Sequence, residues 1–169
     1  MQVTVQPKAP HYVVAFRRAL LQLGGSPPSP VLQCDPSGRS WIATVGEHTV
    51  AVKPCTIADS AWVELRDSVG NTGWLFSSTM WVAFNSQPRK EFVVVARTEL
   101  TSLVQHQVSA QSRTTTHQGE AVAGVVLRRA NRPLETCTRV LITDLLSLRS
   151  TWRMTSTSEL LPTPARGTP

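Results

Sequence analysis

Three residues in the first half of the chain are of types that could together hold a metal ion. Asp35 and Glu64 carry carboxylates, and Lys53 lies between them in the sequence. Carboxylate oxygens are the ligands that Mg²⁺ prefers in proteins. If the fold brings these three side chains together, they form a minimal one-metal site.

Other arrangements of the same region stay open. A second possible site uses Asp59 as one acid and Glu64 as another. In this arrangement the guanidinium of Arg66, two residues after Glu64, takes the place of the lysine amine. Asp67 is a further acid close to Glu64. The purely structural interpretation pairs Glu64 with Arg66 or Lys53 across a sheet.

The sequence shows no other pattern typical of a catalytic or cofactor site. The four histidines have no partner at helical spacing and no Cys-x-x-Cys neighbour, so no zinc site is indicated. Cys34, His48 and Cys55 could converge across a hairpin, but their irregular spacing favours buried thiols and a surface histidine. The three cysteines are odd in number and widely spaced, which predicts free thiols in a reducing compartment. There is no G-x-S-x-G, Walker A or dinucleotide glycine motif. We therefore expect no cofactor, unless the acids above hold Mg²⁺.

Arginine dominates the basic residues, at fourteen of seventeen, and the net charge is +6 with a pI near 10. The planar guanidinium is well shaped for phosphate, so a polyanionic partner, DNA or RNA, is one interpretation. The other interpretation is that a GC-rich genome favours arginine codons and that these arginines lie on ordinary solvent-exposed faces. The candidate nucleic-acid contacts are Arg17, Arg18, Arg39, Arg66, Arg128, Arg129 and Arg132.

Hydrophobic periodicity predicts an alternation of strands and helices. Helices are expected at 11–23, ended by two glycines, and at 97–108, where apolar residues recur at helical spacing. Strands are expected at 41–45, 48–53, 61–65, 81–84, 91–96 and 121–128, and a strand running into a short helix at 139–148. This order predicts an α/β or α+β fold, with one central mixed β-sheet flanked by helices.

The length fits a single domain, which we place at residues 1–153, with the core sheet at about 40–128. A tail rich in Ser, Thr and Pro follows at 154–169. The sequence has no apolar run of about 18 residues and no charged region ahead of its first apolar segment. We therefore expect an intracellular protein that does not associate with membranes.

The middle of the chain carries a series of short motifs. Asp35, or the Arg39-Ser40 turn, precedes a strand that ends in Val50-Ala51-Val52-Lys53. The later motifs are Trp62-Val63-Glu64-Leu65, a Gly73-Trp74 corner, Met80-Trp81-Val82-Ala83-Phe84, and Phe92-Val93-Val94-Val95 with Leu100. In this order, from about residue 30 to 105, the chain resembles the PD-(D/E)XK, or restriction-endonuclease-like, superfamily. It is most similar to a small branch common in phages and prophages.

The resemblance implies a metal-dependent nuclease, from which this chain departs at two positions. Acidic residues of such enzymes hold one or two Mg²⁺ ions, and a lysine positions the attacking water or stabilises the developing charge. Lys53 matches that lysine. Ala51 stands where the acid two residues earlier is expected, and Met80 stands where another acid is expected. These departures predict a nuclease-like fold with a degenerate active site.

We therefore expect a non-catalytic module that serves as a structural or interaction subunit, with protein partners in a virion or nucleoprotein assembly. Two alternatives remain open. One is an active Mg²⁺-dependent endonuclease or exonuclease that uses Lys53, Glu64 and Asp35. The other is a simple nucleic-acid-binding protein that uses the arginines. A phage origin, which the resemblance implies, would place the protein in the host cytoplasm or in the virion.

Overall fold

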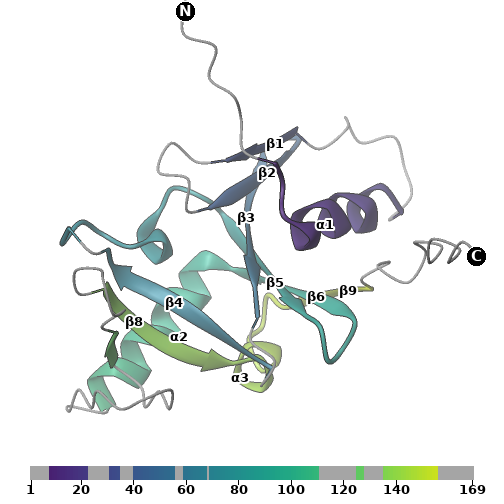
Figure 1. Ribbon diagram of the computed structural model, residues 1–169. Helices are drawn as coiled ribbons and strands as arrows, with labels where there is room; N and C mark the ends of the chain where they lie inside the picture. The colour runs from purple at the N-terminus through teal and green to yellow at the C-terminus, as the bar shows by residue number, and fades with distance from the viewer. Residues whose placement is uncertain are drawn as a thin grey trace, which may run out of the picture.

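The computed structural model of the chain describes residues 8–22, 31–34, 40–55, 59–67, 69–110, 125–127 and 135–155. Asp35, Arg39, Arg128, Arg129, Arg132 and the Pro-rich segment 26–30 therefore lie outside the described residues. Within the described part, strands and helices form two sheets and two apolar clusters (Figure 1). No described helix is long and apolar enough to cross a membrane.

The larger sheet has six strands in the order β1-β2-β3-β5-β6-β9. Its strands are β1 (Val31–Cys34), β2 (Trp41–Val45), β3 (His48–Pro54), β5 (Trp81–Ser86), β6 (Glu91–Ala96) and β9 (Trp152–Thr155). Every neighbouring pair is antiparallel except β3 and β5, which are parallel. Strands β5 and β6 are buried along almost their whole length, as their unbroken apolar sequences predict for central strands.

One face of this sheet is covered by α1 (His11–Gln22) (Figure 1). The helix begins at Pro10, whose carbonyl accepts hydrogen bonds from the N–H groups of Val13 and Val14 at 3.0 and 3.2 Å. Phe16 packs edge-to-face on Phe92 of β6, with ring centroids 5.1 Å apart. We call the apolar cluster between α1 and the sheet the first core.

The opposite face carries the remaining described elements. The crossover between β3 and β5 contributes β4 (Ser60–Arg66) and the 3₁₀ helix η1 (Trp74–Phe76), and β6 leads into α2 (Arg97–Ala110). A second sheet, in the order β4-β8-β7, is completed by β7 (Val125–Leu127) and β8 (Glu135–Leu141), and α3 (Ile142–Leu146) follows β8 directly. We call the cluster that β4, η1, α2, β8 and α3 form with Val82, Phe84, Val93 and Val95 the second core. Figure 1 shows α2 crossing behind β4 and β8.

The predicted α+β class with a mixed central sheet flanked by helices is confirmed, and the predicted elements lie close to their expected residues. Three features differ. The strand at 61–65 belongs to the second sheet, because it pairs with β8 instead of its sequence neighbours. Short edge strands β1 and β9 extend the central sheet beyond the expected residues 40–128. Met154, assigned from the sequence to the tail, is a buried residue of the first core.

Gly73 is the residue that lets the crossover close against β4. Its N–H donates to the carbonyl of Leu65 at 2.8 Å, and a Cβ at this position would lie 2.2 Å from the carbonyl oxygen of Glu64. A contact this short with backbone atoms cannot be relieved by rotating a side chain. The glycine of the predicted Gly-Trp corner is therefore required by close packing, since its φ of −70° is open to any residue.

We expect Gly73→Ala to lower the free energy of unfolding by about 3 kcal/mol, because the methyl group forces η1 away from β4. Gly46→Ala is the matched control. Gly46 has a φ of +58° but open space around its Cβ position, so only backbone strain of about 1 kcal/mol applies. Denaturant titrations of both variants measure the difference. Equal losses in the two variants would contradict the packing argument.

Candidate functional site

Lys53 occupies a buried position on the face of the central sheet that carries the second core. Side chains alternate along β3, and Val50 and Val52 belong to the first core, so Ala51 and Lys53 point to the opposite face. Only 7% of Lys53 is exposed. A buried amine of this kind needs polar or aromatic partners to offset its loss of water.

Two partners of the Lys53 amine come from different directions. Nζ donates a hydrogen bond to the Ser40 hydroxyl, which lies just before β2. The same nitrogen lies 4.4 Å from the centroid of the Trp74 ring, a cation–π geometry. Trp74 in turn lies against Phe84, with ring centroids 6.3 Å apart. The lysine is thus held between a hydroxyl and an aromatic ring that the crossover brings over the sheet.

The two positions at which the chain departs from the nuclease pattern lie on the same face as Lys53. Ala51 is 2% exposed and is paired with Ile42 on β2 and Val82 on β5, so its neighbours in the sheet are apolar. Met80 comes directly before β5 and by alternation shares the face of Val82. Its N–H donates to the carbonyl of Thr49 at 3.0 Å, which fixes its place beside the start of β3.

Of the acids proposed from the sequence, Glu64, Asp59 and Asp67 lie within the described residues. Asp35 lies outside the described residues. Glu64 is on β4, where the alternating Ala61 and Val63 belong to the second core, so Glu64 points away from that core. The Asp67 carboxylate accepts from the N–H groups of Val69 and Asn71, both at 2.8 Å, and so braces its own loop.

The register built on Asp59 and Glu64 does not form a shared metal site. The two residues are five apart along an extended strand, about 16 Å at 3.3 Å per residue, whereas a shared cation needs oxygens a few ångströms apart. The described part of the chain also contains no group of three or more His, Cys, Asp or Glu side chains that could share an ion.

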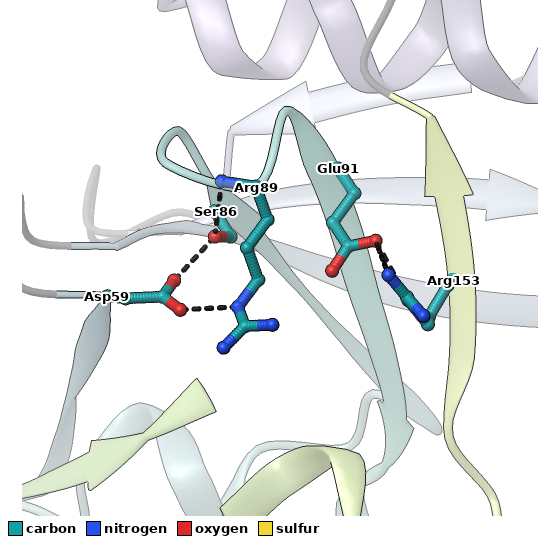
Figure 2. Close-up of polar contacts among 5 residues, drawn as sticks. All are labelled: Asp59, Ser86, Arg89, Glu91 and Arg153. Atoms are coloured by element: carbon teal, nitrogen blue, oxygen red, sulfur yellow. Dashed lines mark hydrogen bonds and ion pairs between the residues drawn. The ribbon is translucent and has the colours of Figure 1, made fainter. Parts of the chain in front are cut away.

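A second polar cluster lies at the end of the β5–β6 hairpin, and we call Asp59, Ser86, Arg89, Glu91 and Arg153 the hairpin-end cluster (Figure 2). The Asp59 carboxylate accepts from the Ser86 hydroxyl with one oxygen and from Arg89 Nε with the other. Arg89 also donates its backbone N–H to the Ser86 hydroxyl at 3.4 Å. Asp59, which has a φ of +52°, is thereby tied to the hairpin turn.

The other half of the cluster is an ion pair between neighbouring strands. Arg153 of β9 places both Nε and Nη2 at 2.8 Å from Oε2 of Glu91 on β6. The Glu91 side chain is 9% exposed and that of Arg153 is 62% exposed. The other carboxylate oxygen, Oε1, is buried and has no hydrogen-bond partner within the described residues. Within the part of the chain that the structure describes, Arg153 is thus the one cationic partner of Glu91.

The arginines predicted to contact nucleic acid are only partly within the described chain. Arg17 and Arg18 are exposed on α1, and Arg66 is exposed at the end of β4. Arg89 and Arg153 were not among the predicted residues. Their partners Asp59 and Glu91 are 30 and 62 residues away in the sequence, so no local motif could have indicated these pairs.

A shallow groove of about 640 Å³ runs between α2 and the α3–β9 turn, with Leu103, His106, Leu148 and Arg149 in its lining. Its one carboxylate, Glu99, accepts hydrogen bonds from the N–H and hydroxyl of Ser150, both near 3 Å. These bonds fasten the turn to α2, so we assign Glu99 a structural role.

The comparisons with known proteins give no match: none of the protein-family models, curated proteins or solved structures resembles this chain significantly.

We expect Arg153→Ala to lower the free energy of unfolding by about 1–2 kcal/mol, because it leaves the buried Glu91 carboxylate without a cation. Glu91→Gln combined with Arg153→Ala should recover part of the loss, since no charge is then buried alone. Urea titrations of the two single variants and the double variant give the coupling energy. Strictly additive losses would show that the pair contributes nothing.

Burial, with a smaller contribution from the Asp59 charge, raises the pKa of the Cys55 thiol to about 12. None of the three cysteines forms a disulfide. We expect iodoacetamide to modify Cys55 at least about 100-fold more slowly than free cysteine near neutral pH, because the thiolate is the reactive form. Peptide mass spectrometry over time measures the rate, with the chain unfolded in urea as the control. A folded-state rate near that of the control would contradict the burial.

Proposed function

We propose that this protein is a non-catalytic module with a nuclease-like arrangement of strands, and that it serves as a structural or interaction subunit of a larger nucleoprotein or virion assembly. The observation that carries the proposal is the surroundings of Lys53. The residues that share its face of the sheet, at the positions where the nuclease pattern has acids, are Ala51 and Met80.

The chemistry of these surroundings is poorly suited to a hard cation. Mg²⁺ needs oxygen ligands, and Ala51 offers a methyl group between the apolar side chains of Ile42 and Val82. The Lys53 amine contacts the Ser40 hydroxyl and the Trp74 ring, and both contacts stabilise the lysine as part of the fold. These contacts support a lysine with a structural role.

The alternative is an active Mg²⁺-dependent nuclease that uses Asp35, Glu64 and Lys53. Glu64 lies on β4 in the second sheet and points away from the second core. Lys53 lies under the Trp74 ring at the edge of that core. An active enzyme would cleave DNA or RNA when Mg²⁺ or Mn²⁺ is added, and Lys53→Ala would abolish the cleavage. Metal-dependent cleavage that Lys53→Ala removes would overturn the proposal.

The proposed loss of the metal site predicts that replacing the two missing acids restores metal binding. We expect Mg²⁺ or Mn²⁺ to leave the Tm of the wild-type protein unchanged. The double variant Ala51→Asp, Met80→Asp should gain about 1.4 kcal/mol of stability when the metal is at ten times its Kd. That gain corresponds to a rise in Tm of about 3–5 °C for a domain of this size.

The double variant Ala51→Asn, Met80→Asn is the matched control, because it has the same side-chain size without the charge. Differential scanning calorimetry with and without metal measures all three proteins. A metal-dependent rise in the Tm of the wild type would count against the proposed function. The same rise in the Asn control as in the Asp variant would count against the assignment of the two positions.

A further inference from the structure

The two arginines of the hairpin-end cluster are each held by one edge of the guanidinium. Asp59 binds Arg89 through Nε, and Glu91 binds Arg153 through Nε and Nη2. Within the described residues, no acceptor takes the Nη groups of Arg89 or Nη1 of Arg153. The side chains are 33% and 62% exposed, so these N–H groups are within reach of a ligand.

A guanidinium fixed in this way is prepared for an oxyanion. It has five N–H donors in a planar fork, and one edge can bind a carboxylate while another faces a phosphate. The carboxylate also restricts the long side chain before a ligand arrives, which reduces the entropy lost on binding. Asp59 and Glu91 therefore act as positioning residues for the two arginines.

The cluster lies along one end of the central sheet, on a single face. Ser86 is paired with Glu91, and Arg153 is paired with Val93 of the same strand as Glu91. Only β6 separates β5 from β9, and the two residues are offset by two positions along the strands, so the Cα atoms of Ser86 and Arg153 lie about 12 Å apart. Figure 2 shows Glu91 between the two arginines. Lys90 in the same turn is exposed.

The edge strand β9 adds an aromatic surface next to these arginines. Trp152 precedes Arg153 and points to the opposite face of the strand, where it stacks on Trp81 with ring centroids 5.0 Å apart. Trp152 is 58% exposed. Because β9 is the last strand of the sheet, a ligand that follows the edge can reach Arg153 on one face and Trp152 on the other. Phosphates beside exposed aromatic rings are the recognition pattern of single-stranded nucleic acid.

We propose that the β9 edge and the hairpin-end cluster bind single-stranded nucleic acid, with Arg89 and Arg153 on backbone phosphates and Trp152 stacked on a base. The inference rests on the proposed function, because it names the ligand of a module that binds without cutting. The net charge of +6 on the whole chain favours such a polyanion.

Fluorescence anisotropy with labelled single-stranded DNA and RNA oligonucleotides tests the proposal in salt from about 50 to 200 mM. Arg89→Ala and Arg153→Ala should each weaken binding about tenfold, the equivalent of one charge-assisted contact. Each should also reduce the salt slope by about 0.7 for the lost phosphate contact. Trp152→Ala should weaken binding about tenfold and leave the slope unchanged, because stacking releases no counterions.

Arg149→Ala is the matched control, since it removes the same charge from the exposed turn at the α2 groove. It should change the affinity by less than about twofold. If Arg153→Ala proves unstable, the double variant Glu91→Gln, Arg153→Ala removes the phosphate contact without leaving a buried carboxylate unpaired. Arg89→Lys keeps the positive charge and tests whether the planar guanidinium is needed. The variants' Tm values confirm that each is folded.

Wild-type affinity in the Arg89 and Arg153 variants, or an equal loss in the Arg149 control, would overturn the proposal. Binding to vesicles of anionic phospholipid but not to oligonucleotides would overturn it in favour of a lipid phosphate. The same samples with Mg²⁺ are examined for cleavage products. Cleavage would contradict the proposed function but not the proposed binding site. If the protein neither binds nor cleaves the oligonucleotides, only the proposed binding site is contradicted.

Discussion

The parallel pairing of β3 with β5 is the constraint on which the rest of the structure depends. Parallel neighbours cannot be joined by a tight turn, so residues 55–80 must leave the central sheet and return at its other end. That crossover supplies β4, which pairs with β8 in the second sheet. It also supplies η1, which places Trp74 over Lys53. The second core and the surroundings of the lysine are therefore consequences of one strand pairing.

The same crossover explains how a lysine persists in the interior. A buried amine is unfavourable without compensation, and here a hydroxyl from the start of β2 and an indole ring from η1 surround it. Ala51 lies beside it in a row of apolar side chains. The arrangement gives Lys53 a structural role in joining the crossover to the sheet.

Most secondary structure was predictable from the sequence, because alternation and helical spacing are local signals. The helix near residues 11–22 and the hairpin through β2 and β3 appear where periodicity predicts them. The partner of each strand was not predictable, so β4 was assigned to the wrong sheet. Strands β1 and β9 have only four residues each, too few for a periodic signal.

The candidate site, like the fold, was predictable from the sequence only where the signal is local. The position of Lys53 followed from a short motif, whereas the pairs Asp59–Arg89 and Glu91–Arg153 depend on contacts between distant segments.

The place of β9 in the first core has a consequence for how the chain folds. Met154 packs in the cluster that contains Val13 and Phe16 of α1, so this core joins residues near both ends of the described chain. Contacts of such large sequence separation close late and slow folding, because the loop entropy must be lost first. During synthesis, the second core can assemble from residues 61–145 and α1 can pack on the earlier strands, while the place of Met154 in the first core stays unfilled until β9 has left the ribosome. A nascent chain would therefore expose the β6 edge of the central sheet until β9 is made, a period in which a chaperone or an assembly partner has access to that edge.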